Sequence, residues 1–208
     1  MMYPTDDEAK KLITAVCRRM YEKNYVVSND GNVSVKVGDN AFWTTPTGVC
    51  KGDIIEDMLV KVDADGNILS GSLKHSSELK MHLRLYRENE KIGAVVHAHP
   101  PVATAFACAG MALEAPVLAE AVLKLGTVPL APYADLGTQK VADVAAPYAN
   151  DYHALLLANH GAVTWSEDVW QSYYLLESVE QYAKILLYTK ILGSQKKLSS
   201  AEIAFLRK

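Results

Sequence analysis

The sequence predicts one layered α/β or α+β domain that spans residues 1–208. Half of the residues are hydrophobic and 22% are charged, which provides enough apolar material for a substantial core. Strand-like and helix-like patterns alternate from one end of the chain to the other, as they do in layered folds. Because no internal repeat, low-complexity tract or Pro/Gly/Ser-rich linker interrupts them, we place no domain boundary.

The first third of the chain predicts a helix followed by two hairpins. From Thr5 to Tyr21, apolar residues recur at helical spacing behind an acidic start, namely Leu12, Ile13, Val16, Cys17 and Met20. Next, valines alternate with polar residues between turn formers in SNDGNVSVKVGDNAFWTTPTG, the pattern of a half-buried hairpin. An Asp-Gly turn joins two short apolar runs in LVKVDADGNILSG, which predicts a second hairpin or a sheet extension.

The middle of the chain predicts three or four helices around one buried strand. In SSELKMHLRLYRENE, Ser76 or Ser77 is expected to cap a helix whose apolar face holds Leu79, Leu83 and Tyr86. AVVHAH is expected to be a buried strand and PVATAFACAG a short helix. EAPVLAEAVLKLG predicts another helix that ends just before Gly126, and LGTQKVADVAAPYA also has helical spacing.

The last third predicts strands and then a long helix. The apolar run ALLLANHGAVTW is short for a helix and lies between turn formers, so it predicts a central strand or a strand pair. The segment DVWQSYYLLESVEQYAKILLYTKIL predicts a long terminal helix.

Composition excludes several classes of function. A net charge of −3 gives no broad basic field for nucleic acid, so any anionic ligand must be held by a few local groups. Cys17, Cys50 and Cys108 are too few and too widely spaced for a disulfide framework, and we expect them to be small buried hydrophobes in a reducing cytoplasm. The acidic N-terminus and the lack of a run of ~18 apolar residues predict neither export nor membrane insertion.

Two histidines in the AVVHAH strand suggest a metal site. Because side chains alternate along a strand, His97 and His99 are expected on the same face as Val95. Two buried imidazoles need partners for four ring nitrogens, and a shared divalent metal meets part of that need, although ordinary buried or ligand-bonding histidines remain the alternative. A catalytic zinc takes about three protein ligands, and His160 before Gly161 is the best further donor.

The other histidines lie in polar or helix-surface settings. We therefore expect His75, His82 and His153 to be solvated or locally hydrogen-bonded, with no part in a metal site.

Six motifs, in this order and at these separations, carry a resemblance to a known family: GNVSV (31–35), TPTG (45–48), SSE (76–78), VVHAH (95–99), APYA (131–134) and NHG (159–161). Together they resemble the class II aldolase/adducin family, and most closely its L-fuculose-1-phosphate aldolase branch. The resemblance implies a central mixed, largely antiparallel sheet flanked by helices. It also implies one zinc ion per subunit, with manganese or cobalt as alternatives, held by the following residues: Glu78, His97, His99 and His160.

The same resemblance implies a phosphate-binding site formed by Gly31, Asn32, Thr47, Gly48, Ser76 and Ser77. Elementary chemistry agrees with it, because a helix N-terminus offers free N–H groups and glycines let the backbone approach phosphate closely. Without the resemblance, these residues are better interpreted as helix caps and turn formers.

The implied reaction is the reversible cleavage of a ketose 1-phosphate to dihydroxyacetone phosphate and a small aldehyde through a metal-stabilised enediolate. Glu78 is the expected general acid/base at C3. A second acid/base must serve the C4 hydroxyl, but Leu118 stands where the family has a tyrosine. Glu120 is the candidate substitute, with a surface or salt-bridge role as its alternative, and Tyr133 is a weaker candidate whose alternative is a packed turn.

Three alternatives remain open. A pentulose-phosphate 4-epimerase typically has Lys at the place of Thr45 and Asp at the place of Glu78, which disfavours it here. A decarboxylase of a keto-acid sugar phosphate would use the same chemistry, whereas an adducin-like interaction module would use none. The resemblance further implies a homotetramer with sites at subunit interfaces, and the C-terminal SSAEIAFLRK is a candidate segment for closing over the site.

Overall fold

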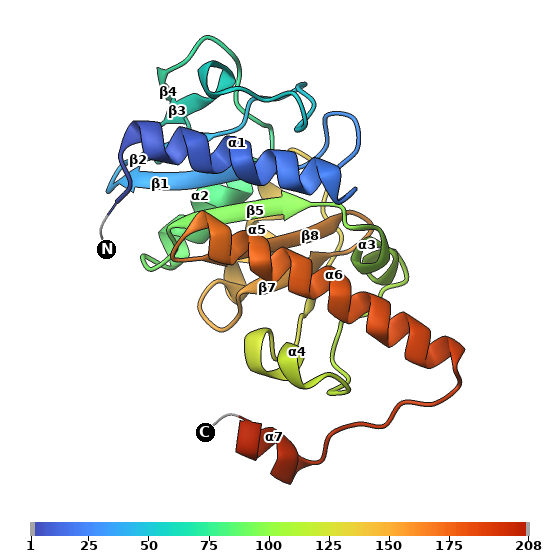
Figure 1. Cartoon of the computed structure of the whole chain (residues 1–208). Coiled ribbons are helices and arrows are strands. Elements are labelled where there is room, and N and C mark those ends of the chain that lie inside the picture. The colour runs from blue at the N-terminus through green and yellow to red at the C-terminus, as the bar shows by residue number, and fades with distance from the viewer. Residues whose placement is uncertain (1–2, 207–208) are drawn as a thin grey trace.

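The computed structural model describes residues 3–206 and contains an eight-stranded sheet between two layers of helices (Figure 1). The strand order is β4-β3-β2-β1-β5-β8-β7-β6. Neighbouring strands are antiparallel except for the parallel pair β6 and β7, which confirms the mixed, largely antiparallel sheet. The strands are β1 (Asn32–Gly38), β2 (Ala41–Thr44), β3 (Val60–Val62), β4 (Ile68–Ser70), β5 (Ala94–Ala98), β6 (Leu130–Ala131), β7 (Ala154–Leu157) and β8 (Gly161–Ser166).

The helices divide between the two faces of the sheet. Buried side chains of α1, α3 and α6 share one core with Ala94 and Val96 of β5, whereas those of α2 and α5 share a second core with Val95. This alternation along β5 is the period-two pattern that the sequence predicts. The helices are α1 (Asp6–Glu22), α2 (Leu79–Glu88), α3 (Pro101–Cys108), α4 (Ala119–Lys124), α5 (Gln139–Ala145), α6 (Val169–Ile191) and α7 (Ser200–Leu206), with short 3₁₀ turns at Glu56–Met58 and Ala146–Tyr148.

Most of the expected elements are present where the sequence placed them. Thr5 caps α1 in a reciprocal capping box with Glu8, and the acidic first turn suits the positive end of the helix. The two expected hairpins are β1–β2 and β3–β4, and the ALLLANHGAVTW run forms the antiparallel pair β7–β8. Helix α4 begins only at Ala119, later than expected, and the N–H of Gly126 closes its end on the carbonyl of Ala121.

The expected serine cap of α2 is wrong. The N-cap residue is Glu78, and no side chain caps it. Residues 76–79 form a turn in which the N–H of Leu79 donates to the carbonyl of Ser76, so the helix starts two residues later than a Ser76 cap would require. The Ser76 hydroxyl instead accepts a hydrogen bond from the N–H of Glu78, and it therefore positions that residue directly.

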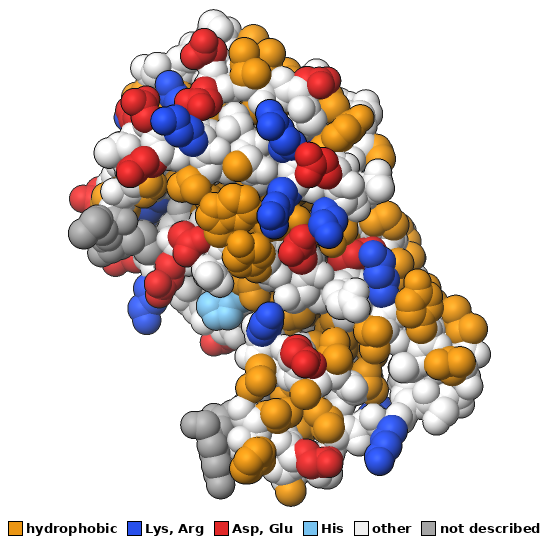
Figure 2. Space-filling model, in the orientation of Figure 1, with side chains coloured by type: hydrophobic (Ala, Val, Ile, Leu, Met, Phe, Trp, Pro, Cys, Tyr) orange, Lys and Arg blue, Asp and Glu red, His pale blue; other side chains and the backbone are white. Residues whose placement is uncertain are grey.

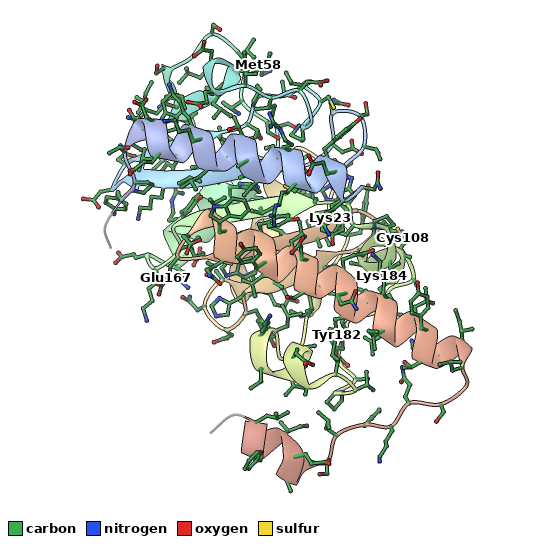
Figure 3. The ribbon with its side chains drawn as sticks, in the orientation of Figure 1. Lys23, Met58, Cys108, Glu167, Tyr182 and Lys184 are labelled. Carbon is green, nitrogen blue, oxygen red and sulfur yellow. The ribbon has the colours of Figure 1, made fainter. Side chains whose placement is uncertain are left out.

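The cysteines follow their predicted role only in part. All three are free thiols, but only Cys17 is buried. Cys108 is exposed at the end of α3 (Figure 3), and Cys50 is half-buried. The buried residues of α3 are Ala103, Phe106 and Ala107, whereas Cys108 is the last residue of the helix. A position in an apolar run therefore does not by itself bury the residue.

The C-terminal part of the chain extends from the body of the sheet. The hydroxyl of Tyr182 on α6 donates to the carbonyl of Ala115 at 2.6 Å and ties α6 to the segment that leads into α4 (Figure 3). After α6, the chain returns so that α7 packs against α4 (Figure 1). Hydrophobic side chains gather around the end of α6 and on α7 (Figure 2), where Ile191, Leu192 and Phe205 are largely exposed. Within residues 3–206, no helix has both the length and the apolar character needed to span a membrane.

Candidate metal centre

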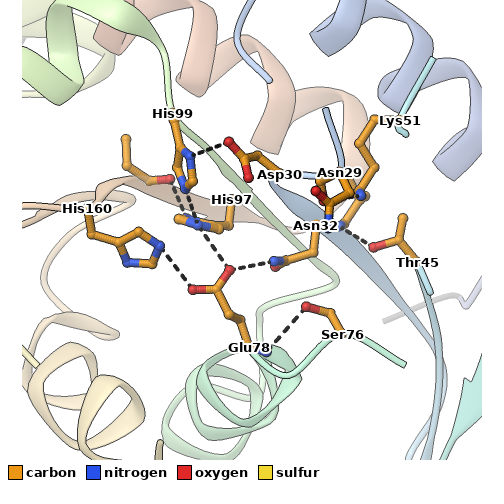
Figure 4. Close-up of polar contacts among 12 residues, drawn as sticks. Asn29, Asp30, Asn32, Thr45, Lys51, Ser76, Glu78, His97, His99 and His160 are labelled. Carbon is orange, nitrogen blue, oxygen red and sulfur yellow. Dashed lines mark hydrogen bonds and ion pairs between the residues drawn. The ribbon is translucent and has the colours of Figure 1, made fainter. Parts of the chain in front are cut away.

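Five side chains from four parts of the chain meet at one end of the central strands (Figure 4). Asn32 opens β1 and is the register partner of His97 near the end of β5. His99 follows β5, and His160 lies in the turn that joins β7 to β8. Glu78 directly precedes α2, and its side chain reaches the group from the helix layer that contains α2.

The three imidazoles present their donor nitrogens to one another. One donor atom from each of His97, His99 and His160 lies within 4.8 Å of the other two. The Nε2 atoms of His97 and His99 are 3.2 Å apart. The Glu78 carboxylate bridges the group, with Oε2 3.2 Å from Nε2 of His97 and Oε1 3.0 Å from Nε2 of His160.

This arrangement fits a divalent cation. The Nδ1–H of His97 has the Ala162 carbonyl as acceptor at 2.9 Å, so the neutral ring turns a bare Nε2 toward the Glu78 carboxylate. Two electron-rich atoms face each other there, and they require a proton or a cation between them. In addition, Oε1 of Glu78 is buried, and its 3.0 Å contact with Nε2 of His160 does not have the geometry of a hydrogen bond. Three imidazole nitrogens and one carboxylate form a donor set that zinc accepts in tetrahedral sites.

The electrostatics of the group keep Glu78 charged and two imidazoles neutral. Burial alone would raise the pKa of Glu78, but the charge of His97 and the close contacts with the His160 and His97 rings outweigh it and hold this pKa below its ordinary range. Burial opposes the charged form of His97, yet Glu78 raises its pKa overall. Burial lowers the pKa of His99 and of His160, so both rings keep a lone pair free for a metal at neutral pH.

Two glycines allow the loops of the site to lie close to the end of β5. Gly161 lies against the ring of His99, because a β-carbon there would come within 2.5 Å of its Cδ2 and 2.6 Å of the Ala98 carbonyl oxygen. Gly31 has φ +72°, and a β-carbon would come within 2.8 Å of the His97 carbonyl oxygen. Side chains at either position would push the loops of the site away from β5.

The residues expected to bind phosphate lie on segments that meet beside Glu78. The segments 45–48 and 74–77 run side by side, since the N–H of Thr47 donates to the Lys74 carbonyl and the N–H of Ser76 to the Thr45 carbonyl. Thr47, Gly48 and Ser77 are exposed, whereas Ser76 is buried.

Asn32 also contacts Glu78. Its Nδ2 donates to Glu78 Oε2 at 2.8 Å, and its buried Oδ1 has no protein partner. Asn32 therefore touches the proposed metal ligand directly, which the sequence pattern did not indicate.

Among the described residues, no hydrogen bond or ion pair joins Glu120 or Tyr133, the candidates for a second acid/base, to this cluster. Glu120 is exposed on α4 and lines a cavity of about 300 Å³ together with Leu118, Tyr174 and Glu177. Tyr133 has 60% of its surface exposed. The C-terminal helix α7 packs on α4, and the last two residues of the expected closing segment, 207 and 208, lie outside the described range.

Sequence reasoning placed His82 wrongly and missed two other residues. His82 is fully buried on α2, with Nδ1 2.8 Å from the hydroxyl of Ser34, so it is not a helix-surface residue. Asp30 lies 3.4 Å from Nδ1 of His99. Lys51 is 1% exposed and donates from Nζ to two main-chain carbonyls. His75 contacts the neighbouring Ser76 carbonyl through Nδ1, as expected for a locally bonded ring.

Comparisons with known proteins find similarity over almost the whole chain. The model of the family described as Class II Aldolase and Adducin N-terminal domain matches residues 11–187. The chain is 35% identical over 209 residues to 3-oxo-tetronate 4-phosphate decarboxylase of Escherichia coli strain K12, covering 97% of this chain and 96% of that protein. It is 34% identical over 178 residues to L-fuculose phosphate aldolase of Methanocaldococcus jannaschii, covering 86% and 95%.

Solved structures give the same result. The crystal structure of YgbL from Escherichia coli matches with a TM-score of 0.89 and 35% identity, over 98% of this chain and 99% of that one. A structure of L-fuculose 1-phosphate aldolase matches with a TM-score of 0.89 and 29% identity, over 99% and 96%.

Proposed function

The chain belongs to the class II aldolase and adducin family, and from that premise we propose that it is a zinc-dependent sugar-phosphate aldolase. Its reaction would cleave a ketose 1-phosphate similar to L-fuculose 1-phosphate, reversibly, into dihydroxyacetone phosphate and a small aldehyde. The observation that carries the proposal is the convergence of three imidazole nitrogens within 4.8 Å beside a buried carboxylate. The curated proteins to which the chain is similar over most of its length are aldolases and decarboxylases, so the chain is an enzyme, and the lyase class is consistent with them.

The metal would be held by His97, His99, His160 and Glu78. When bound, the cation supplies a Lewis acid that stabilises the negative charge developing on the substrate oxygens as the carbon–carbon bond breaks. Glu78 is the proposed acid/base at the carbon next to the carbonyl. The Glu78 carboxylate contacts two of the rings, and the Asn32 amide donates a hydrogen bond to its Oε2. Asn32 would keep this hydrogen bond when the carboxylate turns toward a substrate.

The phosphate would bind where the loops 45–48 and 74–77 meet. Gly31, Asn32, Thr47, Gly48, Ser76 and Ser77 are the proposed binding residues. The exposed Thr47 and Ser77 hydroxyls and the open backbone at Gly48, where a β-carbon would meet nothing within 4 Å, leave room for an anion beside Glu78.

The proposed source of the second acid/base is a neighbouring subunit. Glu120 would be brought to the cluster by another copy of the chain, as in a homotetramer with sites at subunit interfaces. The exposed Ile191, Leu192 and Phe205 support assembly, because apolar side chains that gather on one surface favour burial against a partner.

A second candidate is decarboxylation of a 3-oxo sugar-acid phosphate. It is favoured by the 35% identity to the Escherichia coli decarboxylase over 97% of this chain, a longer match than that to the Methanocaldococcus aldolase. The same cluster serves both reactions, since each leaves negative charge on the oxygens of an enediolate.

One assay separates these reactions. Zinc-loaded protein is incubated with L-fuculose 1-phosphate, L-ribulose 5-phosphate or a 3-oxo-tetronate 4-phosphate, and dihydroxyacetone phosphate, the epimer and carbon dioxide are measured, with His97→Ala as the control. The proposal predicts that the wild-type protein forms dihydroxyacetone phosphate and that the His97→Ala control does not. Release of carbon dioxide alone would support the second candidate. The absence of any product from the ketose phosphates and the oxo-acid phosphate would contradict both.

A further inference from the structure

We propose that Asp30 is a positioning residue of the metal centre, which accepts a hydrogen bond from Nδ1–H of His99 and thereby directs Nε2 of that ring at the cation. The inference deepens the proposed function and rests on the metal site assigned there. Asp30 would hold no metal itself.

The geometry places the two ring nitrogens of His99 on two different partners (Figure 4). Nδ1 lies 3.4 Å from Oδ2 of Asp30, and Nε2 lies 3.2 Å from Nε2 of His97. Because the two nitrogens are on opposite sides of the imidazole, a bond from Nδ1 to the carboxylate leaves Nε2 facing the cluster. A small movement of the half-exposed Asp30 side chain brings the contact to ordinary hydrogen-bond length.

The carboxylate suits the ring that it serves. His97 is completely buried and fixes its tautomer with a main-chain carbonyl, whereas the side chain of His99 is 25% exposed. Water competes for the nitrogens of an exposed ring, and a charged acceptor holds Nδ1–H more strongly than a neutral one. An acceptor at Nδ1 also raises the basicity of Nε2 as a metal ligand.

The loop that carries Asp30 is anchored on both sides of it. Before Asp30, the N–H of His99 donates to the Tyr25 carbonyl at 2.9 Å, and Nζ of buried Lys51 donates to the Asn29 carbonyl at 3.0 Å. After Asp30, Gly31 lies directly against the His97 carbonyl. These contacts tie the loop to the end of β5, so the backbone that carries the Asp30 carboxylate has a fixed place beside His99.

Lys51 joins two of the loops around the site. Besides the Asn29 carbonyl, its Nζ donates to the Val49 carbonyl at 2.8 Å. Burying an ammonium group is costly unless it is hydrogen-bonded, and here the bonds hold the Asp30 loop against the segment that follows Gly48.

The test measures metal affinity and needs no substrate. Full-length chain is stripped of metal, and zinc affinity is measured by competition with a chromophoric chelator for wild type, Asp30→Asn and Asp30→Ala. Asp57→Asn, an exposed site on the 3₁₀ turn Glu56–Met58, is the control for the loss of one negative charge. We expect Asp30→Ala to bind zinc ~10- to 100-fold more weakly, Asp30→Asn to fall between it and wild type, and the control to match wild type.

A second readout separates positioning from a general structural effect. Long-range ¹H–¹⁵N spectra of the metal-free proteins report which nitrogen of His99 carries the proton, and Asp30→Ala should reduce the Nδ1–H form while leaving the thermal midpoint of the protein unchanged. Equal zinc affinity in wild type and Asp30→Ala overturns this inference but leaves the proposed metal site intact. A wild-type chain that binds no zinc overturns the proposed function as well.

Discussion

The buried ring of His82 makes the stability of the metal-free protein depend on pH in a way that one substitution should remove. His82 is fully buried beneath β1, with Nδ1 against the Ser34 hydroxyl and Nε2 without a protein partner. Burial, together with the nearby charge of His97, lowers the pKa of His82 from 6.5 to about 3. The ring is therefore neutral in the folded protein at any pH where the fold is normally studied.

The sign follows from proton counting. Between pH 6.5 and 3, the unfolded chain binds a proton at His82 that the folded chain does not, so the free energy of unfolding falls as the pH falls. The slope approaches ~1.4 kcal/mol per pH unit, and between pH 7 and pH 5 this one ring costs about 2 kcal/mol. Because the ring is completely buried, solvent does not screen this effect on the free energy of unfolding.

The assay is urea unfolding at pH 7, 6 and 5 in the presence of a chelator, followed by tryptophan fluorescence. Compared with wild type, His82→Gln should lose about 2 kcal/mol less between pH 7 and 5, although the lost contact with Ser34 makes it about 1 kcal/mol less stable at pH 7. His153→Gln, which removes an exposed histidine, is the matched control. If wild type and His82→Gln lose stability in parallel, the buried neutral ring does not titrate as argued.

Four further results are expected. Glu78→Gln should lower kcat by ~10²- to 10⁴-fold while the fold survives, as judged by circular dichroism, and an unchanged kcat would remove Glu78 from the chemistry. Gly161→Ala should weaken zinc binding at least ~10-fold, because its β-carbon meets a metal-site imidazole at 2.5 Å; wild-type affinity in the chelator assay would show that the ring can yield. Lys51→Met leaves two partly buried main-chain carbonyls without this donor and should cost ~1–3 kcal/mol in urea unfolding, an estimate that full stability of the variant would refute. In the folded protein a thiol reagent should label Cys108 quickly and leave Cys17 unlabelled, since Cys17 is buried and burial raises its pKa to about 12; rapid labelling of Cys17 would show that this core opens.

The sequence predicted those parts of the site that depend on local periodicity. His97 and His99 share a face because side chains alternate along β5, and a strand or strand pair around His160 was predicted from an apolar run too short for a helix. The alternation along β1 predicted its valines to face a core, but it did not predict the burial of Asn32 and Ser34 on the other face, where Ser34 packs against His82 of α2.

Other parts depend on how distant segments meet. His82 is the exception. It is three residues after Leu79 and four before Tyr86, so helical phase alone could have placed it on the buried face. Asp30 was interpreted as a turn former, because its distance from His99 depends on a loop that crosses the end of β5. Glu120 is near the expected tyrosine position in sequence, but its place in the fold depends on how α4 packs on α6 and α7.

Anomalous diffraction at the zinc absorption edge, from crystals of this chain grown with zinc, tests the central claim most directly. We predict one strong peak per chain, about 2.0–2.2 Å from the Nε2 atoms of His97, His99 and His160 and from a carboxylate oxygen of Glu78. Rings that point away from one another with no peak among them would contradict the account.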